Sequence, residues 1–467
     1  MPAAPAIQVF NASTGEVLGE VAEAGEAGVA QVVNRAAAAA REWWGIGSTV
    51  RADAVAAFGA AVAAHADELA RLDARNAGNP ISGMRRGALQ GARTLRHFAG
   101  LALQLTGETI PATTDHLHYT LREPFGVVGT IVPFNHPTLF ATARTAAPLV
   151  AGNAVVLKPA HQTPLSAVRL QELADAHLPP GVFNVVTGGA ATGSALVRHP
   201  ETRRIGFTGG VETALRVAAD AATSGSIKRI SYELGGKNAM VILPDVDPDV
   251  AAEAAVEGMN LTRVAGQSCG STSRLFLHSD IHDAVRDRIS DRLGSLRFGP
   301  PEDEATQIGA LVSAEQRDRV EHYVALGESV GAQLVAGGRR PTQPPFDRGF
   351  YYPPTLFDQV KPSMVIAQEE IFGPVLAMIE WTDEAEMLEA VNATRYGLTA
   401  SIYTNDLSAA HRLASQIQAG YIWINDVEKR WIGVPFGGQK DSGTGTEYST
   451  EELFSYTQNK TVSLRLQ

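Results

Sequence analysis

The sequence contains a single cysteine, Cys269, and its thiol could act as a nucleophile. It lies in the run Gly266-Gln-Ser-Cys-Gly270, whose small and polar residues favour a turn with an accessible thiol. An accessible thiol ionises to a thiolate, and a thiolate attacks carbonyl carbons. A lone cysteine is also common as an inert buried side chain. The run therefore indicates a candidate nucleophile. Catalysis would also require other side chains that act with the thiol.

Two polar side chains elsewhere could serve such a nucleophile. Glu233 follows a predicted strand at 228–232 and precedes paired glycines, so it could face a cleft and act as a general base. The alternative is a surface carboxylate before a turn. Asn135 lies between Pro133 and Pro137, which restrict the backbone and give its amide a defined direction. That amide could stabilise an oxyanion, or it could only form an Asx turn.

Several widespread site motifs are absent from the sequence. No Gly-x-Gly-x-x-Gly follows a strand, and there is no Gly-x4-Gly-Lys-Ser/Thr and no His-Glu-x-x-His. No nucleophile elbow of the Gly-x-Ser-x-Gly type follows a credible strand. One cysteine excludes a disulfide within the chain and the cysteine-rich zinc and iron–sulfur sites. We therefore expect no metal, and motif scanning alone predicts an α/β enzyme of undefined chemistry.

The composition is that of a folded globular protein, with 467 residues, 45% hydrophobic and 19% charged, and a formal net charge of −11. This length exceeds what one hydrophobic core supports, so two or three domains are expected. An acidic chain lacks the positively charged surface that nucleic-acid binding requires. The sequence shows no signal peptide and no stretch approaching ~18 uninterrupted apolar residues. We expect a cytoplasmic protein with neither a nucleic-acid nor a membrane partner.

The elements that must position these residues alternate between helices and strands. Residues 25–44 and 48–77 are predicted helices, with Ser48 as the N-cap of the second, and a third helix extends from Pro80 to about Gly100. Short β-branched runs then alternate with helices, at 126–132, 154–157, 183–186 and 204–207. This rhythm predicts βαβ units and a mostly parallel sheet, which binds nucleotides at the carboxyl ends of its strands.

A second series of strands indicates a second α/β unit, with the boundary near residue 235. Its runs are at 238–243, 274–278, 374–381, 398–403 and 421–425. The fold class is therefore α/β. Residues 115–123 and about the last 15 residues are strand-like and stand apart. They could pair with each other and with another subunit, or form a ribbon within one molecule only.

Seven short motifs, in one order along the chain, together resemble those of the aldehyde dehydrogenase superfamily. They are Pro133-Phe-Asn135, Lys158-Pro159, Phe207-Thr-Gly209, Glu233-Leu-Gly-Gly-Lys237, Gly266-Gln-Ser-Cys269, Glu369-Glu-Ile-Phe-Gly-Pro374 and Pro435-Phe-Gly-Gly-Gln-Lys440. The resemblance covers essentially the whole chain. It implies an aldehyde dehydrogenase-like fold with a Rossmann-type cofactor-binding domain (1–105 and 125–234), an α/β catalytic domain (235–440) and oligomerisation segments (106–124 and 441–467). A homodimer or homotetramer is implied.

The resemblance implies a covalent route on Cys269. The thiolate attacks the aldehyde, and the side-chain amide of Asn135 and the backbone N–H of Cys269 hold the oxyanion. After hydride transfer a thioester remains, and Glu233 activates the water that hydrolyses it. Relatives that transfer the acyl group to coenzyme A usually lack this glutamate, so we expect a free carboxylic acid as product.

The implied cofactor is NAD or NADP, and the resemblance assigns residues to its parts. Lys158 matches a lysine that binds the adenosine ribose, and Glu370 a carboxylate that binds the nicotinamide ribose, with Phe372 beside the ring. Arg319 stands where relatives have a further ribose contact. The remaining implied cofactor residues are Val132, Pro133, Phe134, His161, Thr208, Gly209, Gly210, Leu234 and Gln316.

Two departures from the family pattern concern this cofactor. Gly210 stands where a serine is frequent, and Ala214 replaces a later glycine, so pyrophosphate contacts should rely on backbone N–H groups. His161 stands where members that prefer NAD commonly carry a glutamate that would repel a 2′-phosphate. We therefore expect NADP to be accepted; the alternative is that His161 points to solvent.

By the same resemblance, substrate-pocket residues are His136, Phe140, Arg263, Ser268, Arg430, Trp431 and Phe436. Some semialdehyde dehydrogenases carry an arginine at the position of Arg263, where bidentate pairing holds a distal carboxylate. A carboxylate-bearing semialdehyde is one expectation. The alternatives are that Arg263 pairs with Glu257 or Glu428, and that a neutral aliphatic or aromatic aldehyde is the substrate. A cysteine acyltransferase without redox chemistry and a non-enzymatic binding protein are the rival classes.

Overall fold

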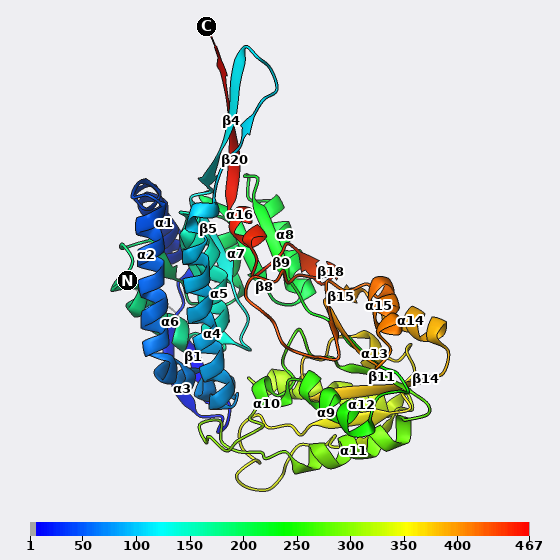
Figure 1. Ribbon diagram of the computed structural model, residues 1–467. Coiled ribbons are helices and arrows are strands. Elements are labelled where there is room, and N and C mark those ends of the chain that lie inside the picture. The colour runs from blue at the N-terminus through cyan, green and yellow to red at the C-terminus, as the bar shows by residue number, and fades with distance from the viewer. Residues whose placement is uncertain (1–5, 467) are drawn as a thin grey trace.

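The computed structural model describes residues 6–466, which form two α/β units and a projecting β ribbon (Figure 1). The first sheet has the strand order β19-β9-β8-β5-β6-β7 and is parallel except for β19. Its strands are β5 (Val127–Ile131), β6 (Ala154–Lys158), β7 (Phe183–Val185), β8 (Thr202–Thr208), β9 (Arg229–Glu233) and β19 (Gly443–Thr444). The predicted α/β class is confirmed.

Helices surround this first sheet and supply its core. The bounds are α1 (Gly25–Gly45), α2 (Ser48–Ala64), α3 (Ala66–Ala77), α4 (Ile81–Gly100), α5 (Pro137–Val150), α6 (Leu165–Asp175), α7 (Ala190–Arg198), α8 (Val211–Ala222) and α16 (Thr450–Ser455), with a short 3-10 turn at Ala102–Gln104. Apolar side chains of α2, α4 and α5 pack together against the buried strands β5 and β6. The carboxyl ends of β5, β8 and β9 are thereby held at one edge of the sheet.

The second sheet has seven strands in the order β12-β13-β14-β11-β10-β16-β17. The strands are β10 (Ala239–Ile242), β11 (Arg274–His278), β12 (Gln333–Ala336), β13 (Thr355–Asp358), β14 (Val375–Trp381), β16 (Thr399–Tyr403) and β17 (Tyr421–Ile424). The helices are α9 (Pro248–Gly258), α10 (Leu261–Val264), α11 (His282–Ser295), α12 (Ala314–Ser329), α13 (Val365–Gln368), α14 (Glu384–Asn392) and α15 (Leu407–Gln416). All four residues of β10 are buried, as expected for a central strand covered on both faces.

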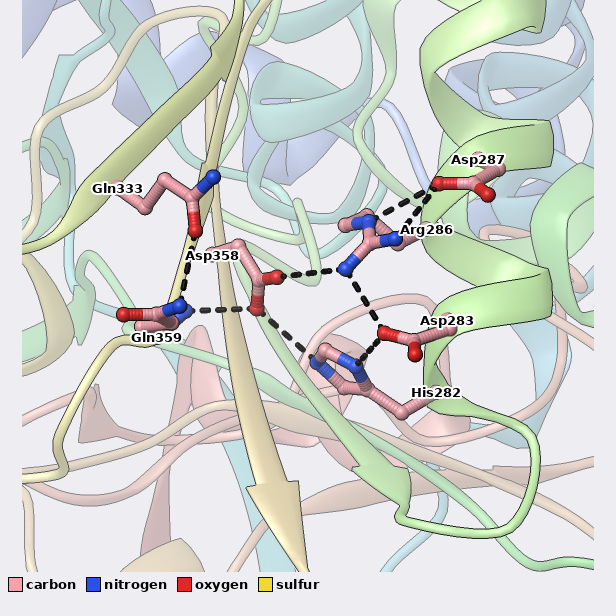
Figure 2. Close-up of polar contacts among 7 residues, drawn as sticks. All are labelled: His282, Asp283, Arg286, Asp287, Gln333, Asp358 and Gln359. Carbon is pink, nitrogen blue, oxygen red and sulfur yellow. Dashed lines mark hydrogen bonds and ion pairs between the residues drawn. The ribbon is translucent and has the colours of Figure 1, made fainter.

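A polar cluster fixes α11 to the outer strands of the second sheet (Figure 2). Asp358, at the end of β13, accepts from His282 Nε2 at 3.0 Å and from Arg286 at 3.4 Å. The hydrogen bond with Asp358 raises the pKa of His282. Asp283 contacts both cations from the helix side. The cluster contains none of the predicted site residues and positions α11.

The ribbon is built from three antiparallel strands that project beyond the helices (Figure 1). They are β3 (Thr109–Ile110), β4 (His116–Pro124) and β20 (Thr457–Arg465), and β20 pairs with β4 along its whole length. The predicted pairing of these two distant segments is therefore confirmed. Within residues 441–466, Gly443–Thr444 pair with β9, α16 packs on α5, and β20 belongs to the ribbon.

Two local predictions were wrong. The helix expected over 48–77 is interrupted at His65, whose ring nitrogen Nδ1 hydrogen-bonds the carbonyl oxygen of Ala61 at 2.8 Å. No glycine or proline marks this break. Ser48 is also not the N-cap: Gly47 takes that position, with φ +88°, and the Ser48 hydroxyl accepts a hydrogen bond from Arg51.

Four short paired elements carried too little sequence signal to be predicted. They are the hairpin β1 (Ala6–Phe10) with β2 (Val17–Ala22), and the two-residue strands β15 (Tyr396–Gly397) and β18 (Gln439–Lys440). Among residues 6–466 no single helix is long and apolar enough to cross a membrane. One bent pair, α1 with α2, meets the length and composition criteria together, with 119° between the two helices.

Candidate active site

Cys269, Glu233 and Asn135 converge on one cleft of about 670 Å³, although they come from three separate parts of the chain. Glu233 ends β9 and Asn135 follows β5, both at the carboxyl edge of the first sheet. Cys269 lies in a turn before β11 of the second sheet. The cleft is therefore lined by a nucleophile from one α/β unit and by a carboxylate and an amide from the other.

The turn that carries Cys269 is held by close backbone contacts. Gly266 has φ +76°, and a Cβ there would lie 2.5 Å from the carbonyl oxygen of Gly373, so only glycine fits. The Asn238 amide donates to the carbonyl oxygens of Cys269 at 2.7 Å and Ser271 at 3.0 Å. The backbone N–H of Cys269 forms no hydrogen bond within residues 6–466. It is a free donor next to the thiol.

The Cys269 thiol is half-buried, and burial raises its pKa. The Arg430 guanidinium is the strongest opposing influence and favours the thiolate, whereas Glu233 and Glu370 disfavour it. A thiolate at this position therefore depends on positive charge from Arg430.

Asn135 is 2% exposed and is fixed at both its backbone and its side chain. Its backbone carbonyl accepts from Asn79 at 2.9 Å, and its amide nitrogen donates to the carbonyl oxygen of Gln267 at 2.8 Å. Gln267 belongs to the turn that carries Cys269. Because a primary amide has two N–H donors, the second remains for an oxyanion formed beside the thiol.

Glu233 lies in a buried acidic cluster that sequence reasoning missed. Its carboxylate is 3.9 Å from Arg144 Nη2, and its other oxygen has no partner within the described chain. Arg144 forms an ion pair with Glu447, and Glu452 lies against Glu447. Burial raises the pKa of Glu233, Glu447 raises it further, and Arg144 and Arg430 oppose the rise. A carboxylate with a raised pKa is suited to accept a proton from water near neutral pH.

The other end of the cleft is formed by the loop that contains Glu370 and Phe372. The Glu370 carboxylate accepts from the Gly236 N–H at 3.2 Å, and a Cβ on Gly235 would collide with it at 1.9 Å. Burial raises the pKa of Glu370 to about 7. Phe372, with φ +60°, packs edge-on against Phe134 at 5.5 Å between ring centroids.

Gln316 and Arg319 line the same cleft and also support this loop. Gln316 donates to the carbonyl oxygens of Ile371 at 3.2 Å and Phe372 at 2.8 Å. Arg319 donates to the carbonyl oxygen of Glu370 at 2.6 Å. Both side chains thus hold the backbone that places Glu370 in the cleft.

The first turn of α8 borders the cleft together with Thr208, Gly209, Gly210 and Leu234. A Cβ on Gly209 would lie 2.7 Å from the Phe207 ring, whereas Gly210 has open space around it. Free N–H groups at a helix N-terminus stabilise a phosphate, so this turn fits the pyrophosphate of a dinucleotide. Pro133 and Phe134 also line the cleft.

Val132, Lys158 and His161 do not line this cleft, although they lie at the same edge of the sheet. The Val132 N–H donates to the Lys158 carbonyl oxygen at 3.2 Å. Burial lowers the pKa of Lys158 to about 8, opposed by Glu23. Burial, and then Lys158, lower the pKa of His161, opposed by Glu315 and Glu23. His161 is exposed and Lys158 is buried, and both lie among groups of mixed charge.

A second cavity of about 320 Å³ receives most of the predicted substrate residues: His136, Phe140, Arg263, Ser268, Arg430 and Trp431. Phe140 lines both cavities. Phe436 packs beside Cys269 and carries the Arg430 guanidinium on its ring at 4.3 Å. The cavity is thus adjacent to the nucleophile.

Arg263 forms the pairing that the sequence held as an alternative: its Nη1 is 3.7 Å from the Glu428 carboxylate. Glu428 also lines the cavity. Two arginines on α4, Arg86 and Arg93, also line it and form no ion pair within residues 6–466. Their seven-residue spacing, which is visible in the sequence, places them on one face of the helix.

No group of three or more His, Cys, Asp or Glu side chains that could hold a metal ion occurs among residues 6–466.

The chain is similar in sequence and in fold to known proteins. Residues 2–462 match the model of the aldehyde dehydrogenase family. The chain is 44% identical over 467 residues to aldehyde dehydrogenase tropH of Talaromyces stipitatus, covering 98% of this chain and 90% of that protein. PnpE from Pseudomonas sp. WBC-3, solved in complex with nicotinamide adenine dinucleotide, superposes with a TM-score of 0.96 and 35% identity, covering 99% of this chain and 95% of that chain. An aldehyde dehydrogenase from Bacillus cereus in complex with NAD+ gives a TM-score of 0.95 and 34% identity over 99% and 94% of the two chains.

Proposed function

Because this chain belongs to the aldehyde dehydrogenase family, we propose that it oxidises an aldehyde to the free carboxylic acid with NAD, through a covalent intermediate on Cys269. The observation that carries the proposal is the convergence of Cys269, Glu233 and Asn135 on one cleft. Their side chains supply a nucleophile, a proton acceptor and an amide donor, which are the groups that this reaction needs.

In the first half of the reaction, the Cys269 thiolate attacks the aldehyde carbon and forms a thiohemiacetal. The free N–H of Cys269 and the second N–H of the Asn135 amide stabilise the oxyanion, because both are fixed before the reaction begins. NAD, when bound, supplies the acceptor for the hydride that leaves the former aldehyde carbon. A thioester on Cys269 remains.

In the second half, Glu233 takes a proton from water and the hydroxyl oxygen adds to the thioester carbon. The carbon–sulfur bond then breaks, the acid leaves and the Cys269 thiolate is restored. The free oxygen of Glu233 and its raised pKa support this role. Product analysis tests it: we expect NADH and acid in equal amounts without coenzyme A, and no turnover in Cys269→Ala. An obligatory acyl-CoA product would contradict the proposal.

The residues that would hold NAD follow the edge of the first sheet. Glu370 would bind the nicotinamide ribose, the first turn of α8 the pyrophosphate, and Lys158 the adenosine ribose. The glycine backbone at Gly235 and Gly209, where any Cβ would collide, fits a site that brings the chain close to a ligand. We propose the first unit as the cofactor-binding domain and the second as the catalytic domain.

NADP is proposed as an accepted second cofactor, because His161 leaves no carboxylate at the position where relatives repel a 2′-phosphate. Glu23 and Glu315 oppose this by their charge, so the balance must be measured. Comparing kcat/KM for NAD and NADP decides it, and a hundred-fold NAD preference contradicts NADP use. His161→Glu should lower kcat/KM for NADP and leave that for NAD within a few fold.

For the substrate we propose an aldehyde with a distal carboxylate. Arg86 and Arg93 supply unpaired positive charge in the cavity, whereas Arg263 is partly neutralised by Glu428. Arg86→Ala and Arg263→Ala should each raise KM for 4-carboxybenzaldehyde more than for benzaldehyde. Arg96→Ala, on the same helix as Arg86 but outside the cavity lining, is the matched control. Equal effects on both aldehydes would favour a neutral substrate.

The ribbon is proposed to join subunits into a homodimer or homotetramer. β20 and β4 project from the body and carry exposed Leu117, Leu121 and Leu464, which a second subunit could cover. Light scattering of the intact chain tests this proposal, and a monomer at all concentrations would contradict it.

A further inference from the structure

A guanidinium and a carboxylate meet over Gly270, the residue that follows Cys269. A Cβ on Gly270 would lie 2.2 Å from Arg430 Nη2 and 3.7 Å from Glu428 Oε1. Both side chains line the cavity of about 320 Å³. A hydrogen-bond donor and an acceptor therefore lie beside the residue that follows the nucleophile.

Each of the two groups keeps a buried polar atom without a protein partner among the described residues. Glu428 is 7% exposed, and its Oε1 has no hydrogen-bond partner within residues 6–466. Arg430 forms no hydrogen bond within the same residues, and its Nε is buried without a partner. Buried polar atoms are nearly always paired, because an unpaired one loses its hydration without compensation. The two side chains are therefore suited to a polar ligand group.

The protein holds both groups in place. The Arg430 guanidinium lies on the Phe436 ring at 4.3 Å. The backbone of Glu428 has φ +67°, a left-handed conformation that a non-glycine residue rarely adopts. Glu428 also contacts Arg263 Nη1 through its other oxygen at 3.7 Å. Glu428 thus lines the cavity with its Oε1 free of any protein partner among the described residues.

We infer that the substrate aldehyde carries a hydroxyl group two or three bonds from the aldehyde carbon, which donates to Glu428 and accepts from Arg430. A hydroxyl both donates and accepts, so it satisfies the two groups at once. A carboxylate in that position would be repelled by Glu428, and an alkyl group would leave both unpaired. The inference rests on the proposed function, because it deepens the substrate class of the same site.

The test compares benzaldehyde, 2-hydroxybenzaldehyde and 2-methoxybenzaldehyde as substrates of the intact enzyme. The methoxy compound can accept but cannot donate, so it isolates the contact with Glu428. We expect kcat/KM for the hydroxyl compound to exceed both others by roughly 10- to 100-fold, as for one hydrogen bond to a charged group. In Glu428→Gln and Glu428→Ala this preference should fall at least tenfold.

Glu257→Gln is the matched control, because it removes the same charge from an exposed side chain that lies near Glu428 but outside the cavity lining. It should keep the preference. A second measurement uses only the wild-type enzyme and compares its inhibition by 2-hydroxybenzoate and by benzoate. The 2-hydroxybenzoate should bind at least tenfold more tightly.

The outcomes separate the two proposals. If benzaldehyde is oxidised but the hydroxyl gives no preference, or if Glu428→Gln slows all three aldehydes equally, the hydroxyl inference is wrong and the proposed function stands. If no aldehyde gives NADH, the proposed function fails, and the inference fails with it.

Discussion

Replacing Glu452 with glutamine tests how the buried acidic cluster beside Glu233 is charged. Glu233, Glu447 and Glu452 are each at most 6% exposed, and Arg144 is their nearest shared cation. Burial and the neighbouring Glu447 raise the pKa of Glu452 well above its usual range. We predict that Glu452 is a neutral acid that donates a hydrogen bond to the Glu447 carboxylate and accepts one from the Tyr448 N–H at 2.6 Å.

The magnitude follows from the charge that Glu452 would add on ionising. Two unit charges about 4 Å apart repel by about 4 kcal/mol at an effective dielectric constant near 20. The raised pKa means that the stability contributed by the neutral acid is fully present below the unfolded pKa and is lost as the pH rises through the folded pKa. Glutamine keeps both hydrogen bonds and never ionises, so Glu452→Gln should gain stability over wild type only at high pH.

Thermal unfolding at pH 5, 7 and 9 measures the effect. An unfolding entropy of about 2.1 cal/mol/K per residue gives about 1 °C per kcal/mol for 467 residues, so the gain at pH 9 is up to about 4 °C. At pH 5 the two proteins should have the same Tm. Activity should stay within about threefold, because Glu233 remains free to accept a proton from water.

Two controls belong to this experiment. Glu451→Gln removes the same charge from the adjacent exposed side chain and should show no such pH dependence. Glu452→Leu leaves the Tyr448 N–H without an acceptor and should lose about 1–3 kcal/mol at every pH. A Tm difference for Glu452→Gln that does not change with pH, or a loss of activity equal to that of Glu452→Leu, would refute the reasoning.

Three further predictions concern the surroundings of the nucleophile. Arg430→Met should slow alkylation of Cys269 by iodoacetamide at pH 7 by roughly tenfold and shift the pH dependence upward, because the guanidinium favours the thiolate; an unchanged pH profile would contradict this. Gly270→Ala should displace Arg430 and lower kcat/KM while cofactor binding, followed by fluorescence titration, is retained. Asn238→Ala should cost about 2–5 kcal/mol in chemical denaturation, because the carbonyl oxygens of Cys269 and Ser271 lose their donor; a change below 1 kcal/mol would disagree.

The sequence predicted those elements whose signal is local. The alternation of β-branched runs with helices located both parallel sheets, and Glu233 falls at the end of its strand as expected. The pairing of β4 with β20 followed from two isolated strand-like segments. The helix break at His65 was not predicted. The His65 side chain hydrogen-bonds the carbonyl oxygen of the preceding turn, and no glycine or proline marks such a break in the sequence.

The missed residues of the candidate site depend on contacts between distant parts of the chain. Arg144 and Glu447 are separated by 303 residues, and the sequence around either residue gives no indication that the two form an ion pair. The sequence named Glu428 as a possible partner of Arg263, but its position over Gly270 depends on a strained loop. Sequence patterns report periodicity and local backbone preference, whereas such charge clusters are products of the assembled fold.

The strand β19 has a consequence for how the chain is synthesised. β9 ends at Glu233, but its outer neighbour, Gly443–Thr444, is made 210 residues later. At about 5–20 residues per second, translation of that interval takes roughly 10 to 40 s. During this time the edge of β9 that carries Glu233 is unpaired and open to other strands. The first unit of the nascent chain therefore cannot complete its sheet until the second has been synthesised.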